Sequence, residues 1–263
     1  MSVLEVHRDA LETCAFCPKL CRFICPVAES EARESVTPWG LLSHADDLRR
    51  SGRSPEQSSF ELWSHCTGCG LCVDACRHSN PVPETIFALR GLARKGHGDP
   101  LQTWAAEAPP ESSALDALPT RGRAILVAGF ATDERIRASL TLLRNSGYAD
   151  LAKPEGGYRH SGWRSLKAGL HDAYELQKER LVEASKSRVL ICLDAEDVET
   201  LRQDIEAENA LSGVRVLHLI EALGELDFAK ADPLTGSVDF FAGCPGSGGA
   251  TQGIEGLDIL RQA

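Results

Sequence analysis

The sequence predicts a multidomain protein in which an α-helical domain comes first and an α/β domain with a mainly parallel sheet follows. Three observations support this prediction. Eight of the ten cysteines lie before residue 77, between short segments of helical pattern. Residues 105–122 are rich in proline, serine and alanine, as linkers often are. Further along, short apolar runs alternate with polar helical segments. The expected boundaries are therefore residues 1–104, a linker at 105–122, and residues 123–263.

The helices expected in the first domain show apolar stripes, at residues 3–14, 37–52 and 83–96. The second of these segments has the clearest ends. Thr37 is a residue type that caps helix N-termini, Pro38 suits the first turn, and Gly52 suits the residue after the last turn. No segment of the first 100 residues reads clearly as a strand. We therefore expect short helices around loops that contain cysteines.

The second domain is predicted from short runs of apolar residues that favour strands, at residues 124–129, 187–194, 214–219 and 237–243. The polar helical segments beside them are residues 133–147, 162–185 and 194–209. Strands that alternate with helices build βαβ units, and such units place neighbouring strands parallel to one another. The expected sheet is therefore mainly parallel.

The cysteines of the first domain form two runs, Cys14, Cys17, Cys21, Cys25 and Cys66, Cys69, Cys72, Cys76. The second run has the spacing C-x2-C-x2-C-x3-C. A zinc site usually takes two pairs of ligands separated by a longer loop, whereas three thiolates two residues apart suit a cubane iron–sulfur cluster. In bacterial two-cluster ferredoxins the fourth cysteine of such a run binds the other cluster, and the motif ends in Cys-Pro, as Cys25 and Pro26 do here.

The spacing therefore predicts two [4Fe–4S] clusters with exchanged fourth ligands. The first would be held by Cys14, Cys17, Cys21 and Cys76, and the second by Cys66, Cys69, Cys72 and Cys25. The alternative for the same cysteines is a zinc-stabilised interaction module. Two departures from the ferredoxin motif are visible: three residues separate Cys17 from Cys21, and Arg77 and His78 follow the second run in place of proline. These two side chains would either offset the negative charge of a cluster or simply face solvent.

The segments "CAFCPKLCRFICPVAESEARESVTPWGLLSHADDLRRSG" and "CTGCGLCVDACRHSNPVPETIFALRGLARKGHGDP" resemble the iron–sulfur subunits of glycolate, lactate and glycerol-3-phosphate oxidoreductases. They are similar also to heterodisulfide reductase subunits. The resemblance covers residues 10–100. It implies a helical ferredoxin-type domain with two [4Fe–4S] clusters, which passes electrons from a flavoprotein partner to quinone or another acceptor.

Residues 123–263 resemble the cysteine-rich domain that follows in the same family. That domain is a tandem repeat, and its cysteines hold a catalytic cluster in heterodisulfide reductases. Most of those cysteines are missing here: Phe130 occupies one such position, Ala195 occupies another, and only Cys192 and Cys244 remain. The second half of the repeat stops after one expected strand and one expected helix. The resemblance therefore implies a degenerate, incomplete domain.

From this resemblance we expect an electron-transfer subunit that is not itself catalytic. The alternative is a catalytic subunit like heterodisulfide reductase, whose residual site at Cys192 and Cys244 is completed by a partner. Residues 236–263 are the expected interface with such a partner, because they would leave a sheet edge and an apolar helix face uncovered.

Composition limits the expected partners and location. The net charge of −10 argues against binding to nucleic acid. No run approaches the roughly 18 apolar residues of a membrane span, and the N-terminus lacks the apolar core of a signal peptide. We therefore expect a cytoplasmic protein, in which ten cysteines are not a disulfide framework. Its expected partner is a flavoprotein or another redox subunit, and any membrane association would be peripheral and made through partners.

Overall fold

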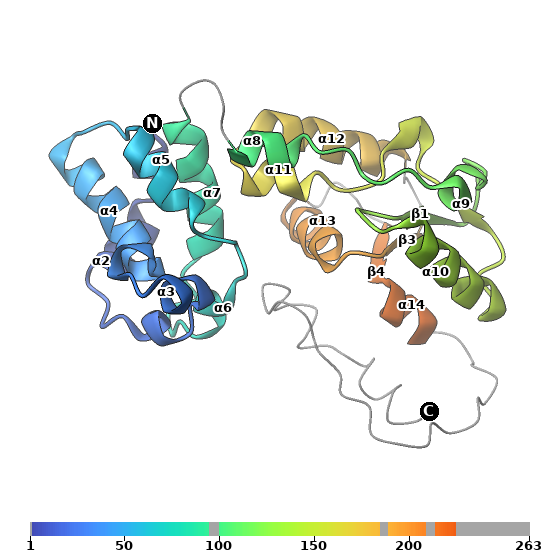
Figure 1. The fold of residues 1–263 in the computed structure, drawn as a ribbon, viewed down its shortest axis with the longest axis horizontal. Coiled ribbons are helices and arrows are strands. Elements are labelled where there is room, and N and C mark those ends of the chain that lie inside the picture. The colour runs from blue at the N-terminus through green and yellow to red at the C-terminus, as the bar shows by residue number, and fades with distance from the viewer. Residues whose placement is uncertain (1, 95–99, 185–188, 209–213, 225–263) are drawn as a thin grey trace, which may run out of the picture. The chain divides into compact units, whose positions relative to one another are not determined.

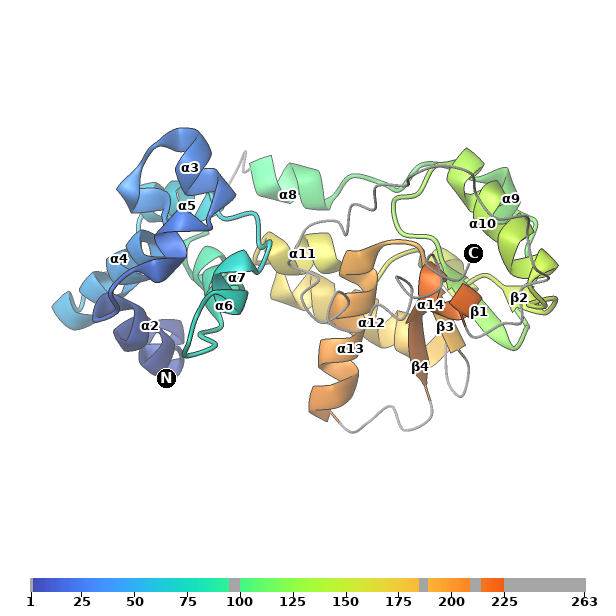
Figure 2. The same ribbon diagram turned by 90° about the horizontal axis from the view of Figure 1, so that it is seen from below.

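The computed structural model of this chain describes residues 2–94, 100–184, 189–208 and 214–224. These residues form two compact units. The first, here called the helical unit, contains residues up to Glu107 together with Arg164–Asp172; the second, the α/β unit, contains Ala108–Trp163 and the described residues from Ala173 onward. Figures 1 and 2 show helices in the former and a helix-covered sheet in the latter. The predicted fold classes are confirmed.

The helical unit is built from α1 (Val3–Val6), α2 (Arg8–Ala15), α3 (Pro26–Glu31), α4 (Pro38–Ser51), α5 (Gln57–Ser64), α6 (Leu71–Asp74), α7 (Val82–Ala93) and α8 (Pro100–Ala105), with short 3-10 turns η1 (Leu20–Phe23) and η2 (Glu34–Val36). Its core packs α2, α4, α5 and α7 together around the buried Trp63. The helix expected at residues 3–14 is divided in two at His7. No strand occurs among the described residues of this unit.

Helix α4 has the ends that its sequence predicts. The Thr37 hydroxyl accepts a hydrogen bond from the Gly40 amide at 3.0 Å and donates one to the Glu34 carbonyl at 2.7 Å. Pro38 is the first residue of the helix, and Gly52 closes it in the left-handed region at φ +66°. Thr37 is buried, so its hydrogen bonds are protected from water. The cap therefore fixes where the chain turns from η2 into α4.

Replacing Thr37 with alanine is expected to lower the free energy of unfolding of the helical unit by about 1 kcal/mol, because the Gly40 amide would lose its partner. Urea unfolding of the cluster-loaded protein, followed by far-UV circular dichroism, measures this loss. Ser58→Ala is the matched control, since Ser58 is an exposed hydroxyl residue within α5. Equal stabilities for the two variants would contradict the assigned cap.

The sheet of the α/β unit has four parallel strands in the order β2-β1-β3-β4. They are β1 (Ala124–Val127), β2 (Leu151–Ala152), β3 (Val189–Cys192) and β4 (Arg215–His218). Three of them lie within the predicted runs. Strand β2 was not predicted, because two residues are too few to show a periodic pattern. The run expected at residues 237–243 lies outside the described residues.

Helices cover both faces of this sheet. They are α9 (Ser113–Asp116), α10 (Asp133–Asn145), α12 (His171–Ala184), α13 (Ala195–Glu208) and α14 (Leu219–Gly224), with the short turn η3 (Glu155–Gly157). Alternate residues of β1 point to opposite layers: Leu126 packs with α9, α10 and α14, whereas Ile125 and Val127 pack with α12 and α13. The helix expected at residues 162–185 is broken into α11 (Trp163–Lys167) and α12.

The segment 105–122 contains the short helix α9. Ser112 before this helix is hydrogen-bonded, and Leu118 after it is buried. Ser112 caps α9 by accepting from the Leu115 amide at 3.1 Å, and the Ser112 hydroxyl donates to Asp133 at 2.6 Å. Leu115 and Leu118 are buried in the core of the α/β unit. This part of the segment is therefore packed against the sheet layer.

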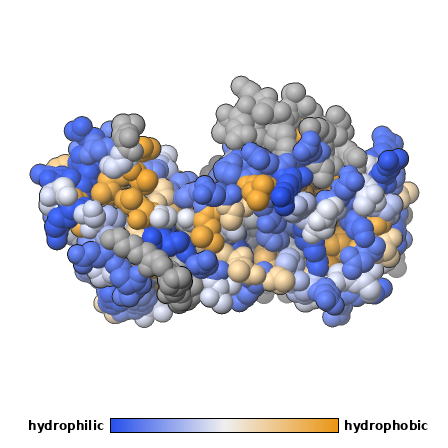
Figure 3. Space-filling view, turned by 90° about the horizontal axis from the view of Figure 1, so that it is seen from above, coloured by the Kyte–Doolittle hydropathy of each residue, from blue (hydrophilic) through white to orange (hydrophobic). Residues whose placement is uncertain are grey.

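The surface in view in Figure 3 is largely hydrophilic, with hydrophobic residues gathered in small patches. Among the described residues with large apolar side chains, Phe16 and Phe23 are the most exposed, at 77% and 83%. Both belong to the segment that carries the first cysteine run. In the described part of the chain, no helix combines the length and the hydropathy needed to cross a membrane.

Candidate metal centre

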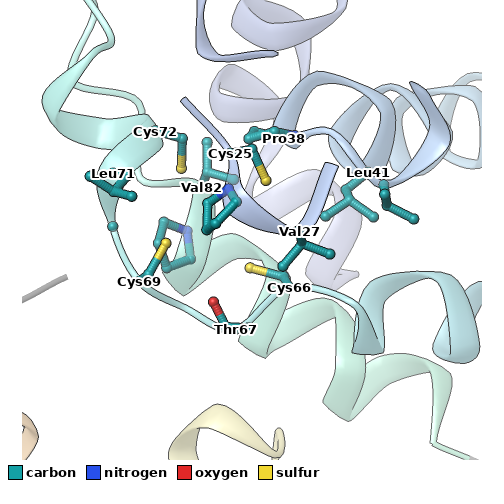
Figure 4. A pocket seen from close by; sticks show the side chains of 14 residues that line it. Cys25, Val27, Pro38, Leu41, Cys66, Thr67, Cys69, Leu71, Cys72 and Val82 are labelled. Carbon is teal, nitrogen blue, oxygen red and sulfur yellow. The ribbon is translucent and has the colours of Figure 1, made fainter. Parts of the chain in front are cut away.

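Four cysteines of the helical unit, Cys25, Cys66, Cys69 and Cys72, line one cavity of about 390 Å³ that is partly open to solvent. Figure 4 shows their sulfur atoms pointing toward the same space. The rest of the wall is apolar apart from Thr67, and none of the residues that line it is charged. Three of these thiols come from the second cysteine run, and the fourth comes from the first.

The remaining four cysteines, Cys14, Cys17, Cys21 and Cys76, line a second cavity of about 720 Å³, which is also partly open to solvent. Cys72 borders this cavity as well as the first. The wall of this second cavity also contains Trp39, Asn80 and the cationic or titratable side chains Lys19, Arg77 and His78. The Lys19 ammonium lies 3.5 Å from the centre of the Trp39 ring. The two cavities therefore differ in charge: cationic side chains line only this one.

The first cysteine run lies where the chain leaves α2, forms the turn η1 and enters α3. Cys14 lies in the last turn of α2, and the Cys17 amide donates to the Cys14 carbonyl at 3.1 Å. Lys19 adopts a left-handed backbone at φ +68°, which turns the chain into η1. Cys25 then directly precedes α3, with Pro26 as the first helical residue. The Cys-Pro ending thus directs the chain away from the second cavity, which the other three cysteines of this run line, and places Cys25 at the first cavity.

Glycines let the second run curl. Gly68 and Gly70 have φ values of +73° and +75°, a region that L side chains rarely adopt. A side chain at Gly68 would also collide with Phe87, because a Cβ atom there would lie 2.6 Å from the Phe87 ring. These glycines allow three thiols within seven residues to face one space.

Asn80 is a site residue that the sequence did not identify. It is 4% exposed, and its amide nitrogen donates to Cys14 Sγ at 3.0 Å and to the Ala10 carbonyl at 2.9 Å. A hydrogen bond to a ligand sulfur stabilises negative charge on it. A single asparagine between a cysteine run and a helix carries no pattern that would have identified it.

Burial keeps several of these thiols protonated when no metal is bound. It raises the pKa of Cys14 to about 12, although the hydrogen bond from Asn80 opposes the rise. Burial also raises the pKa of the Cys21, Cys66 and Cys72 thiols. Thiolates are the form that binds metal, so loading this centre must release protons.

The donor set fits iron–sulfur clusters. Each cavity is lined by at least four thiols, and thiolates alone are the usual ligands of [4Fe–4S] clusters. Among the described residues, no group of three histidine, cysteine or acidic side chains is placed to hold a single metal ion. In each cavity the thiols line a shared space, which suits a cluster of several metal atoms.

Of the remaining predicted site, Cys192 lies in the α/β unit. Cys192 ends β3 and is fully buried between the sheet and the helices α12 and α13, where burial raises its pKa well above the usual value. The Phe130 ring lies 4.9 Å from the ring of His160 and 6.0 Å from that of Trp163, measured between centroids. Cys244 and residues 236–263 lie outside the described residues.

Residues 10–80 match the family model of the 4Fe-4S dicluster domain. The matched segment contains all eight cysteines that line the two cavities. No match to the chain was found among the curated proteins or among the solved structures. Through this domain the chain is an iron–sulfur protein of the 4Fe-4S type that serves electron transfer.

Proposed function

We propose that this protein relays electrons between a flavoprotein-type dehydrogenase partner and an acceptor through two [4Fe–4S] clusters. The observation that supports this proposal most strongly is the composition of the two cavities. Cys25 lies with Cys66, Cys69 and Cys72, while Cys76 lies with the first run, as an exchange of fourth ligands requires. We therefore propose Cys14, Cys17, Cys21 and Cys76 as the ligands of one cluster and Cys25, Cys66, Cys69 and Cys72 as those of the other.

Each bound [4Fe–4S] cluster would accept and release one electron. The chain contributes the surroundings. The thiolates would hold the iron atoms, and the apolar wall around Cys25 and Cys66 would limit the access of water to a bound cluster. Lys19 and Arg77 line the other cavity, where they would offset the negative charge of a cluster. Because Cys72 borders both cavities, the two clusters would be neighbours, as transfer between them requires.

A zinc-stabilised module is less well supported by the same cysteines. Zinc–sulfur bonds of about 2.3 Å place the four sulfur atoms of one site roughly 4 Å apart. No group of three potential ligands in the described part of the chain is placed to hold a single ion. The spacing of the second run, in which three thiols follow one another two residues apart, favours a cluster, which has several metal atoms, over an isolated zinc ion.

We propose further that the protein belongs to the iron–sulfur subunits of the glycolate, lactate and glycerol-3-phosphate oxidoreductase and heterodisulfide reductase family. Within that family the α/β unit would be a non-catalytic module that contacts a partner. Cys192 supports this role, because it is fully buried in an apolar core and presents no surface to a substrate. The proposed location is the cytoplasm.

Anaerobically prepared protein is expected to contain about eight iron and eight sulfide per chain, because two [4Fe–4S] clusters hold that number. Elemental analysis for iron and zinc, together with a sulfide assay, measures the content. The variant Cys192→Ala is the control, since it removes a thiol outside the two cavities and should retain the full content. Stoichiometric zinc without sulfide would contradict the proposed function.

A further inference from the structure

A buried arginine of α7, Arg90, contacts three separate segments of the helical unit. Its guanidinium donates to the Trp63 carbonyl at 2.8 and 3.1 Å, and also to the carbonyls of Cys66 and Lys167. Arg90 is 2% exposed, so these charged hydrogen bonds form away from bulk water, where they are strong. The arginine therefore places a positive charge directly beside one of the proposed cluster ligands.

Residues 164–172, here called the strap, pack within the helical unit although their neighbours in the sequence build the α/β unit. Arg94 of α7 donates to the strap carbonyl of Ala168. Gly169 has φ +76°, and a Cβ atom there would lie 2.5 Å from the Gly91 amide nitrogen and 2.9 Å from the Phe87 carbonyl. Only glycine allows the strap backbone to approach the α7 backbone this closely.

The strap also lies next to the cysteine loop itself. A Cβ atom at Gly68, between Cys66 and Cys69, would lie 3.5 Å from Cε of Lys167 and 2.6 Å from the Phe87 ring. The loop is thus bounded by α7 and by the strap. The Arg90 side chain of α7 joins the loop to the strap, because it donates to the carbonyls of both Cys66 and Lys167. A shift of the strap would move a hydrogen-bond acceptor of Arg90.

We propose that Arg90, held in place by the strap, is a positioning residue that raises the reduction potential of the cluster bound by Cys25, Cys66, Cys69 and Cys72. The inference rests on the proposed function. Reduction adds a negative charge to a cluster that four thiolates already make anionic. A fixed cation beside Cys66 stabilises the reduced state more than the oxidised one, and it does so strongly where little water is present. Part of the chain beyond the cysteine motifs thereby tunes this cluster.

The test is a redox titration of the full-length, cluster-loaded protein, followed by electron paramagnetic resonance. Arg90→Gln is expected to make one of the two reduction equilibria about tenfold less favourable, which is about 59 mV for a one-electron couple, and to leave the other unchanged. Arg90→Lys should restore much of the wild-type potential because it keeps the charge. Arg50→Gln is the control, since Arg50 is an exposed arginine of α4.

A second pair of variants tests the strap without altering charge. Gly169→Ala should shift the same cluster signal as Arg90→Gln, because the added Cβ would push the strap away from α7. Gly157→Ala is the matched control: Gly157 has φ +79°, but a Cβ atom there would have no neighbour within 4 Å. Both substitutions carry the cost of a left-handed alanine, so only the contact with α7 differs.

Unchanged potentials in Arg90→Gln with both clusters retained would overturn the inference, and so would equal shifts of both clusters. If both Arg90 variants lose iron, the strap variants decide: a Gly169→Ala protein that has wild-type spectra and potentials overturns it. A wild-type protein that lacks two clusters contradicts the proposed function instead. The two failures are therefore distinguishable.

Discussion

Replacing Cys25 and Cys69 together by alanine is expected to leave about half of the iron and sulfide, the same content as in either single variant. Both thiols line one cavity, so the second substitution damages a cluster that the first has already removed. Alanine is preferred to serine because a serine oxygen can still bind iron. The retained cluster would keep the spectrum of the site at Cys14, Cys17, Cys21 and Cys76.

The matched double variant, Cys25→Ala with Cys17→Ala, is expected to lose both clusters and nearly all iron. Cys17 and Cys25 belong to the same run but line different cavities. Each double variant removes two thiols from the helical unit, so general loss of stability affects both similarly. Anaerobic iron and sulfide analysis, with electron paramagnetic resonance of the reduced proteins, compares them.

The opposite result would show that each run binds its own cluster. In that case the double variant of Cys25 and Cys17 would retain half of the iron, and the double variant of Cys25 and Cys69 would retain almost none. Loss of all iron from each single variant would mean that the two sites load only together. That outcome would be checked by reconstitution with iron and sulfide before the double variants are compared.

The second large effect is expected at Asp197, a fully buried carboxyl of α13. One carboxyl oxygen accepts a hydrogen bond from the Ser161 amide at 2.6 Å, and the other has no hydrogen-bond partner among the described residues. Burial, with Asp194 and Glu196 nearby, raises the pKa of Asp197 to about 7 from 3.8. The carboxyl is therefore largely protonated in the folded protein at pH 6.

The sign of the pH dependence follows from this shift. Between the two pKa values the folded chain holds a proton that the unfolded chain has released, so rising pH favours unfolding. Burying this carboxyl does not lower the free energy of unfolding below pH 3.8, and it lowers that free energy by the full amount above pH 7. A shift of this size corresponds to a cost on the order of 4 kcal/mol.

Asp197→Asn should remove this dependence, because asparagine keeps the acceptor for the Ser161 amide and has no charge to bury. As the pH rises from 5.5 to 8, the free energy of unfolding of the α/β unit in the variant should increase by about 2 kcal/mol relative to that of wild type. Hydrogen exchange of the β1 and β3 amides, corrected for intrinsic rates, reports the opening of this unit alone. Glu111→Gln, at an exposed carboxylate, is the control. Parallel pH profiles for Asp197→Asn and wild type would contradict the expected effect.

Much of the fold could be predicted from the sequence, because helix ends and strands depend largely on residues that are close to one another in the chain. Thr37 and Gly52 mark the ends of α4 through their own backbone preferences and hydrogen bonds to residues within one turn. The apolar runs at β1, β3 and β4 are strands because their side chains alternate between two helix layers. The spacing of the second cysteine run likewise indicates its chemistry without a fold.

The breaks in the predicted helices have tertiary causes. The segment at residues 162–185 has a continuous helical pattern, yet Gly169 leaves the helix because α7 lies against it. Strand β2 exists because Leu151 and Ala152 pair with β1, not because of their own pattern. In both cases the deciding contact is made with a residue far away in the chain.

The sequence by itself determined which thiols are candidate metal ligands, the helical and α/β character of the two parts, and the caps of α4. These properties follow from backbone preference, periodicity and thiol chemistry, which act over a few residues. Only the tertiary structure decided that Asn80 reaches Cys14, that Arg90 joins the strap to Cys66, and that Asp197 is buried beside Ser161. Such contacts join residues 24 to 77 positions apart, and their strength depends on burial, which arises only when distant segments pack together.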